Sequence, residues 1–224
     1  PRTGLVREFP GPPTFGPGTI LRMTVTETST SLAKESPTRA ARFRTLAECQ
    51  VILPDLDAAP KDSGTLELVV RRPARGEREV LDVGRLDAAY GLEGDNWRDR
   101  AGDAPDPDTQ LNIMSHRMVA FLAADPAVEP LAGDQLYLDL DLSQENLPVG
   151  TRLAIGDPAS PSAVVEVTAK PHTGCKKFVA RFGEHAMRFV NGREGRPRRL
   201  RGLNARVVTP GEVRPGDIVT VIRP

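Results

Sequence analysis

The sequence predicts a mainly β protein, a barrel or sandwich of short strands with a few helices around it. Three observations support this prediction. From Phe43 onward, many short segments alternate apolar and polar residues, which is the pattern of a strand with one buried face. Glycine, proline and aspartate separate these segments, as in the turns of all-β folds. Only two segments space their apolar residues like a helix, so we expect helices at the periphery.

The predicted strands follow one another along the chain. They are CQVILP (49–54), LELVV (66–70), LYLDLDL (136–142), RLAIG (152–156), VVEVT (164–168), ARVV (205–208) and IVTVI (218–222). The last two are joined by a turn that carries two Pro-Gly pairs. We expect the strands to form one closed or nearly closed sheet.

Two helices are expected outside the sheet, near residues 113–123 and 176–191. Apolar residues recur at helical spacing in both. In the first they are Ile113, Met114, Met118, Val119 and Leu122, and in the second Phe178, Phe182, Ala186 and Phe189.

Residues 1–42 are interpreted as a flexible N-terminal arm ahead of a domain at 43–224. The first 22 residues are rich in proline and glycine, and Met23 resembles a natural start. We therefore interpret residues 1–22 as an added leader or a disordered extension, because such a segment buries too little apolar surface to offset its chain entropy.

Composition excludes several classes of protein. The 30 basic and 30 acidic residues cancel, so no net charge attracts nucleic acid or a membrane surface. No apolar run approaches the ~20 residues that span a bilayer. Two cysteines in 224 residues do not form a disulfide framework. We expect a cytoplasmic protein with reduced thiols, no nucleic-acid or membrane partner, and an oligomeric state that the sequence leaves open.

Cys175 is the residue whose surroundings suggest chemistry. His172, Lys176 and Lys177 can each add positive charge near its thiol, and it lies just before the second predicted helix, whose N-terminal N–H groups favour an anion. Thr173 and the following glycine form a turn in which the backbone can approach a ligand closely. Polar neighbours on both sides argue against burial. We therefore expect an exposed, functional thiol at Cys175 and a buried Cys49 that fills a strand face or the core.

Other sites fit the residue inventory less well. Structural zinc needs four Cys/His ligands in close pairs, but only His172 and Cys175 are close in sequence. No nucleophile elbow or cysteine-protease signature is present. Arginines accumulate after the cysteine. They can form a solvated face, a nucleic-acid surface or an anion pocket, and beside a reactive thiol the anion pocket would suit a phosphorylated cofactor.

Five segments occur in the order seen in MOSC domains, named after the C-terminal domain of molybdenum cofactor sulfurases. They are GLEGDNW (91–97), QLNIMSHR (110–117), LSQENLPVGTRLAIGD (142–157), VVEVTAKPHTGCKKF (164–178) and LRGLNARVVTPGEVRPGDIVTVI (200–222). The chain resembles this family over residues 43–224. It differs in having Gly174 where the family often has proline, and in lacking the histidine-glycine segment that reductase members commonly show after GLEGD.

The resemblance implies a MOSC-like β-barrel and a role for Cys175. In the reductase branch the family cysteine is a ligand to the metal of the molybdenum cofactor, a Mo-pyranopterin. Asn146 matches a family segment near the cofactor, and Arg181, Arg199 and Asn204 are candidates for its phosphate. Together with Thr173, these residues form the expected cofactor-binding set. Pyridoxal phosphate is not expected.

Three functions remain open at this point. As a reductase, the protein would remove oxygen from N-hydroxylated or similar small molecules, with electrons from a separate donor protein. As a sulfur carrier or transferase fed by a sulfur-donor protein, it would hold a persulfide on Cys175, with His172 and Lys176 stabilising the charge. As a non-catalytic module, it would only bind the cofactor or present its arginine face to a partner.

Overall fold

The computed structural model describes residues 43–102 and 104–224. The predicted arm, residues 1–42, lies outside the described residues. Among the described helices, none is long and apolar enough to cross a membrane.

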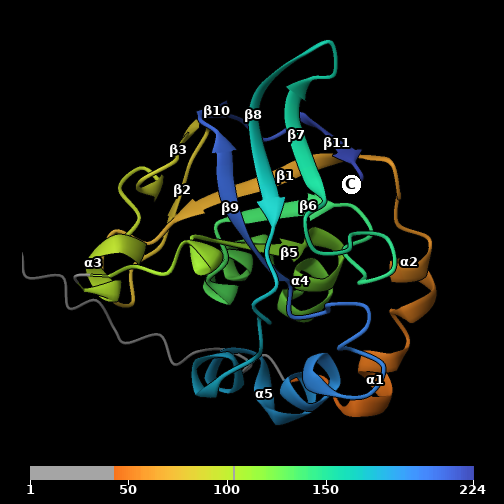
Figure 1. Cartoon of the computed structure of the whole chain (residues 1–224). Coiled ribbons are helices and arrows are strands. Elements are labelled where there is room, and N and C mark those ends of the chain that lie inside the picture. The colour runs from red at the N-terminus through yellow and green to blue at the C-terminus, as the bar shows by residue number, and fades with distance from the viewer. Residues whose placement is uncertain (1–42, 103) are drawn as a thin grey trace, which may run out of the picture. The chain divides into compact units, whose positions relative to one another are not determined.

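A closed barrel of seven strands forms the centre of the described part (Figure 1). Its order is β11-β7-β8-β9-β5-β6-β1, and β1 closes the ring on β11. Neighbours are antiparallel except β5 and β6, which are parallel. The strands are β1 (Ser63–Arg71), β5 (Leu111–Ser115), β6 (Leu136–Asp139), β7 (Arg152–Asp157), β8 (Ser160–Val167), β9 (Leu203–Thr209) and β11 (Ile218–Ile222). The prediction of a mainly β barrel is confirmed.

Short strands extend the barrel. β2 (Glu79–Val80) pairs with the end of β1. A separate small sheet holds β10 (Gly211–Val213), β3 (Gly84–Asp87) and β4 (Gly91–Leu92) in that order. The predicted turn between the last two long strands therefore contains a short strand of its own.

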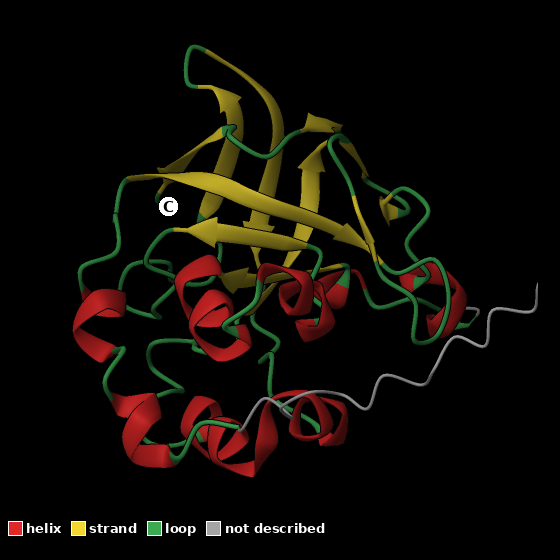
Figure 2. Cartoon of the chain, turned by 180° about the vertical axis from the view of Figure 1, so that it is seen from behind, coloured by secondary structure: helices red, strands yellow, loops and turns green. Residues whose placement is uncertain are grey.

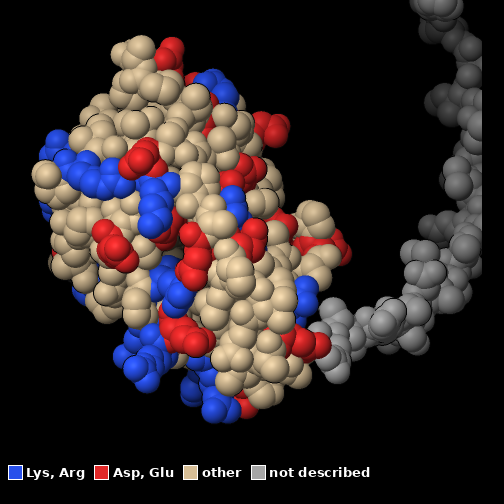
Figure 3. Space-filling model, turned by 90° about the vertical axis from the view of Figure 1, so that its right-hand side faces the viewer, with Lys and Arg blue, Asp and Glu red and all other residues tan. Residues whose placement is uncertain are grey.

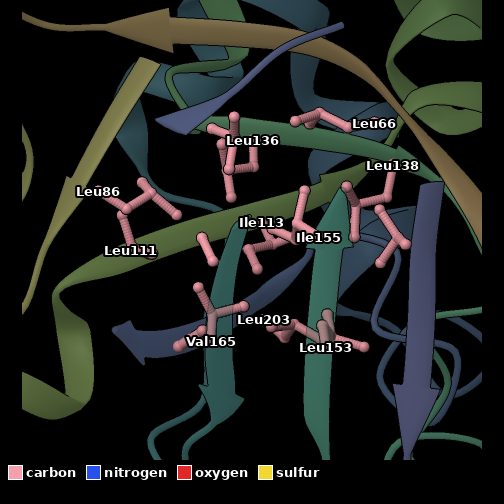
Figure 4. Close-up of a cluster of buried hydrophobic side chains, with 14 of the residues drawn as sticks. Leu66, Leu86, Leu111, Ile113, Leu136, Leu138, Leu153, Ile155, Val165 and Leu203 are labelled. Atoms are coloured by element: carbon pink, nitrogen blue, oxygen red, sulfur yellow. The ribbon is translucent and has the colours of Figure 1, made fainter. Parts of the chain in front are cut away.

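Side-chain alternation fills the barrel. Along β8, Ala163, Val165 and Val167 are buried while the residues between them are partly exposed. Successive side chains of a strand point to opposite faces, so every second residue reaches the interior. Leu153 and Ile155 of β7 lie opposite β8 and meet these side chains. They belong to one continuous apolar cluster inside the barrel (Figure 4).

Helices cover one side of the barrel (Figure 2). The longer ones are α4 (His116–Ala123) and α5 (Lys176–Asn191), with α5 kinked at Gly183. The short ones are α1 (Leu46–Gln50), α2 (Leu53–Asp57), α3 (Trp97–Ala101) and the 3₁₀ turns η1 (Pro107–Thr109) and η2 (Pro126–Ala132). A second apolar cluster joins the outward-facing Met114 and Tyr137 to Phe178 and Phe182 of α5. The apolar face predicted for residues 176–191 is buried, as expected.

Residues 49–54 are not a strand, so that prediction is wrong. They belong to α1, α2 and the turn between them. The Thr45 side chain accepts from the Glu48 N–H while the Glu48 carboxylate accepts from the Thr45 N–H, which is a capping box that starts a helix. Pro54 lies in the first turn of α2, where its missing N–H costs nothing. These local signals outweigh the strand-like alternation, and Cys49 is buried in a helix.

The first predicted helix begins too early. Ile113 and Met114 lie in β5, and the helix starts only at His116, where the Ser115 side chain accepts from the Met118 N–H. Ile113 faces the barrel interior and Met114 the helical layer. A strand buried on both faces has no polar alternation and resembles a buried helix in sequence.

Charges are interspersed on the face seen from the right of Figure 1 (Figure 3). Several arginines of the described part form exposed ion pairs there or nearby, among them Arg198 with Asp57 at 2.7 Å. Exposed pairs of this kind contribute about 0–1 kcal/mol each.

Candidate functional site

Cys175 lies exposed at the N-cap of α5, in extended conformation. The preceding residue is fastened to the far end of the same helix: the Gly174 N–H donates to Asn191 Oδ1 at 3.0 Å, and Asn191 Nδ2 donates to the Gly174 carbonyl at 3.3 Å. A Cβ at Gly174 would lie 2.5 Å from Met187 Sδ, so glycine permits this close approach. The thiol therefore projects from a backbone held in place on both sides.

A cavity of about 460 Å³ opens beside the thiol. Its wall is strongly basic, and no aspartate or glutamate of the described residues lines it. The basic residues are Arg72, Arg75, Arg78, Arg100, Arg181, Arg201 and Lys177, and the wall also includes His172, Cys175, Asn96 and Asn112. These residues come from the loop after β1, from α3 and β5, and from both ends of the β8–β9 connection. The fold thus brings distant basic segments to the one exposed thiol of the described chain.

Two of the arginines, which we call the paired arginines, are neutralised. Arg72 binds Asp95 through two bonds of 2.7 and 2.8 Å and also donates to Asn112 Oδ1 at 2.9 Å. Arg201 binds the carboxylate of Asp134 at 2.7 and 2.9 Å, and Asp134 is 0% exposed. Burial alone would raise the pKa of Asp134, but the charges of Arg201 and His172 and the hydrogen bonds of both residues together outweigh it and lower that pKa from 3.8 to about 2.

The other five, Arg75, Arg78, Arg100, Arg181 and Lys177, are the unpaired basic residues. Within the described chain no carboxylate lies within ion-pair distance of any of them. Arg78 and Arg181 converge over Gly133, where an added Cβ would lie 2.9 Å from Arg78 Nη2 and 3.3 Å from Arg181 Nη1. Burial, then the charges of Arg181 and Arg72, lower the pKa of Arg78.

Three buried polar atoms of the wall lack hydrogen-bond partners. One is Nε of the paired Arg201, and the other two are Arg78 Nε and Asn96 Oδ1. Buried polar groups are nearly always satisfied, so each such atom calls for an explanation. A ligand that carries an anionic group for the unpaired basic residues and a donor for Asn96 would supply partners for the other two. The wall has the chemistry of an anion-binding site with a soft thiol at one side.

His172 differs from the expectation that it adds positive charge near the thiol. Its Nε2 lies 2.8 Å from Asp134 Oδ1, and the ring is largely buried. Burial, followed by the charge of Arg201, lowers the pKa of His172 despite the opposing effect of Asp134. The neutral imidazole is therefore the stable form near pH 7.

The predicted site residues divide among several places. Cys175, His172 and Arg181 line the cavity described above. Thr173 and Arg199 line a second cavity, of about 390 Å³, which shares His172 and Arg201 with the first. Lys176 lines neither cavity, whereas its neighbour Lys177 lines the first.

The two predicted asparagines lie outside both cavity walls and bond within the fold. Asn146 Nδ2 donates to the carbonyls of Lys61 and Asp141 at 2.9 and 2.8 Å. Asn204 accepts from Asn112 at 2.6 Å and donates to the Lys170 carbonyl at 3.0 Å. Asn204 therefore positions Asn112, which lines the first cavity, and does not line that cavity itself.

The sequence analysis missed the contributions of the β1–β2 loop and of Asp134. The run RRPARGER (71–78) follows a predicted strand and supplies Arg72, Arg75 and Arg78. Four arginines around a Pro and a Gly directly after a strand were a visible signal of a basic loop. Asp134 gave no such signal, because a lone aspartate before a strand is typical of an ordinary turn.

Among the described residues, no group of three or more His, Cys, Asp and Glu side chains could hold a metal ion. Cys175 is the only one of the two cysteines that a ligand could reach without a structural change.

Comparison with known proteins identifies a family. The family model described as MOSC domain matches residues 104–220. A search of curated proteins finds no match.

Two solved structures are similar in fold. The YuaD protein from Bacillus subtilis, APC1665, is 18% identical with a TM-score of 0.47, covering 71% of this chain and 95% of that one. YiiM from Escherichia coli is 19% identical with a TM-score of 0.47, covering 71% of this chain and 70% of that one. These likenesses are too distant to support an argument about function.

Proposed function

Because the chain belongs to the MOSC domain family, we propose that it binds the molybdenum cofactor, with Cys175 as a metal ligand and the unpaired basic residues around the cofactor phosphate. One observation carries this proposal: the exposed thiol and five unneutralised basic side chains line the same cavity. A thiolate is a soft ligand suited to such a metal. Arginine forks bind phosphate through two hydrogen bonds.

The residues present fit this group. The cavity, at about 460 Å³, lies in the range of small-molecule sites. Arg78 Nε needs an acceptor and Asn96 Oδ1 needs a donor, and a phosphorylated pterin carries both kinds of atom. Among the described residues the thiol is not part of a cluster of three or more metal-ligating side chains, which suits a metal whose remaining ligands come with the cofactor. When bound, the cofactor would supply two-electron redox chemistry.

The chain's own residues would position the reactants. The bond between Gly174 and Asn191 fixes the backbone from which Cys175 projects. Asp134 holds His172 through Nε2, which leaves Nδ1 without a hydrogen bond to any described residue. Neutral His172 keeps its proton on Nε2 against Asp134 and could therefore accept a proton at Nδ1 beside the cavity. In this proposal the substrates are N-hydroxylated or similar oxygen-bearing small molecules, and a separate protein supplies the electrons.

The test is the metal content of three purified proteins: wild type, Cys175→Ser and Cys49→Ser. We expect stoichiometric molybdenum in wild type and Cys49→Ser and almost none in Cys175→Ser, because a serine oxygen is a poor soft-metal ligand. The Cys49 variant is the matched control, since it changes the same atom at a buried position. Retention of molybdenum by Cys175→Ser would refute the role of this thiol.

A sulfur-carrier function is the second candidate, and one observation favours it: Cys175 and Lys176 are both exposed, so a donor protein could reach the thiol. In that case wild type would release cyanolysable sulfur and contain no molybdenum, and Cys175→Ser would release none. Because His172 is held neutral, the charge of a persulfide would depend on the lysines. If the purified protein contains neither molybdenum nor cyanolysable sulfur, the remaining candidate is a non-catalytic binding module.

A further inference from the structure

The second cavity lies on the other side of His172 and Arg201 from the proposed cofactor site. Its wall is formed by the segment that follows β8, by the end of α5 and by the loop that leads into β9. At about 390 Å³ it has the size of a small-molecule site. The cofactor proposal does not use it.

The wall of the second cavity is basic, and within residues 43–102 and 104–224 no aspartate or glutamate contributes to it. Its basic side chains are Lys170, Arg196, Arg199 and Arg201. Lys170 is neutralised by Asp106, and Arg201 by Asp134. Arg196 is exposed to solvent. Arg199 is the exception, because it is neither exposed nor paired.

Arg199 is a partly buried cation without a counter-ion. Its Nη1 donates to the backbone carbonyl of Leu147 at 2.6 Å and lies 3.5 Å from that of Leu142, and no carboxylate of the described chain reaches it. Burial lowers its pKa, with no opposing charge to restore it. Taking a cation out of water without a partner is costly, so an anion in the cavity would offset that cost.

Arg201 contributes a further unsatisfied donor. The residue is 6% exposed, and its Nε is buried without a hydrogen-bond partner. Its Nη1 is already bound to Asp134, so the free Nε can donate to a ligand without breaking that pair.

The rest of the wall suits an apolar body with a polar edge. Ala169, Pro171, Val190 and Leu203 supply apolar surface, while Thr173, Asn191 and Gln144 supply hydrogen-bonding groups. We propose that the second cavity is a separate binding site for a small oxyanion, a carboxylate or phosphate monoester, carried on a compact apolar body such as an aromatic ring.

A ligand in this position would contact the support of the reactive thiol. Asn191, which lines the second cavity, holds the Gly174 N–H and carbonyl. Thr173 lies in the same wall and directly precedes this glycine. The second site is therefore placed to sense or alter the segment that positions Cys175, although its existence does not depend on the cofactor proposal.

The test uses the full chain with the first cavity weakened. An Arg78→Gln, Arg181→Gln background removes the converging pair over Gly133, and the change in oxyanion binding that Arg199→Gln then causes, measured by calorimetry, reports the second cavity. Three probes distinguish the ligand classes: phenyl phosphate, benzoate and inorganic phosphate. Adding Arg199→Gln should weaken binding of the ring-bearing probe by at least about tenfold, since a charge-assisted hydrogen bond is lost.

Arg198→Gln is the matched control. It removes the same charge one position earlier, but Arg198 pairs with Asp57 on the surface and does not line the second cavity. We expect it to leave binding unchanged. Arg196→Gln offers a second variant at an exposed position and should weaken binding several-fold without risk to folding, which circular dichroism would verify.

Each result decides part of the proposal. Tighter binding of phenyl phosphate or of benzoate identifies the oxyanion, and either supports the site. If inorganic phosphate binds as well as phenyl phosphate, the apolar body is refuted. Absence of millimolar binding in the background variant, or equal losses from Arg199→Gln and Arg198→Gln, would refute the site. Because molybdenum content is measured separately, either proposal can fail alone.

Discussion

The paired arginines and the unpaired basic residues line one cavity but differ in how their charges are balanced. Arg72 and Arg201 each hold a fully buried carboxylate side chain at 2.7 Å. Arg78 and Arg181 converge on each other with no carboxylate between them. The first arrangement stabilises the protein in the absence of any ligand. The unpaired arrangement raises the free energy of the protein until an anion binds. The paired arginines therefore support the structure of the site, whereas the unpaired basic residues are available to a ligand.

The largest effect is expected where a buried pair is broken. Asp134→Asn leaves Arg201 buried without its counter-charge, and we expect the free energy of unfolding to fall by about 3–5 kcal/mol. Urea denaturation would measure it. Asp57→Asn is the control, because it breaks an exposed pair worth less than about 1 kcal/mol. Similar losses in the two variants would contradict a stabilising role for the paired arginines.

The two thiols extend the contrast between buried and accessible groups. Cys175 is exposed, whereas Cys49 is fully buried and its burial raises the pKa of its thiol. We expect iodoacetamide to alkylate Cys175 at least about 100-fold faster than Cys49 in the folded protein, since Cys49 reacts only when the structure opens. Mass spectrometry of timed samples gives both rates. Equal rates would show that α1 opens readily and does not protect the core.

Acid should weaken the buried pair in a defined range. The folded pKa of Asp134, about 2, lies below its unfolded value of 3.8. Its contribution to stability is therefore complete well above pH 3.8 and is lost as the pH falls toward 2. We expect the stability gap between wild type and Asp134→Asn to narrow by about 1 kcal/mol between pH 5 and pH 3. A stability difference that stays constant over this range would mean that the pKa of Asp134 is not lowered by folding.

The smallest effect is expected at the unpaired basic residues. Arg78→Gln removes a charge that Arg181 repels, so stability should stay within about 0.5 kcal/mol of wild type or rise slightly. Arg72→Gln is the matched comparison, because it strands the buried carboxylate of Asp95 and should cost several-fold more. Thermal denaturation of the two variants would compare them. A large loss from Arg78→Gln would reveal a structural role and remove the contrast on which the proposed anion site depends.

Much of the fold could be predicted because strands with one buried face alternate visibly. The segments of β7, β8 and β11 were located for this reason, and the apolar face of α5 was located by its helical period. The errors fall where that signal is absent or misleading. β5 is buried on both faces, and α1 is defined by a capping box rather than by hydrophobic period.

The candidate site was predictable only around its cysteine. The segment from His172 to Cys175 carries enough local chemistry to stand out, and both of these end residues line the first cavity. Arg72 and Asn96 reach the cavity wall, and Asp134 binds Arg201 of that wall, through pairings between strands and loops far apart in the chain. No local sequence pattern predicts such long-range contacts. The same folding places Arg181 and Arg199 in different cavities.

The odd number of barrel strands has a consequence for this site. Around a closed ring, strand directions can alternate throughout only if the number of strands is even. With seven strands, one seam must be parallel, and here it lies between β5 and β6. A parallel pair cannot be joined by a hairpin and needs a long crossover. That crossover, residues 116–135, contains α4 and η2 and carries Gly133 and Asp134 just before β6. The odd number of strands thus requires a crossover, and this crossover carries Asp134, the buried carboxylate that binds Arg201 and His172 of the cavity wall.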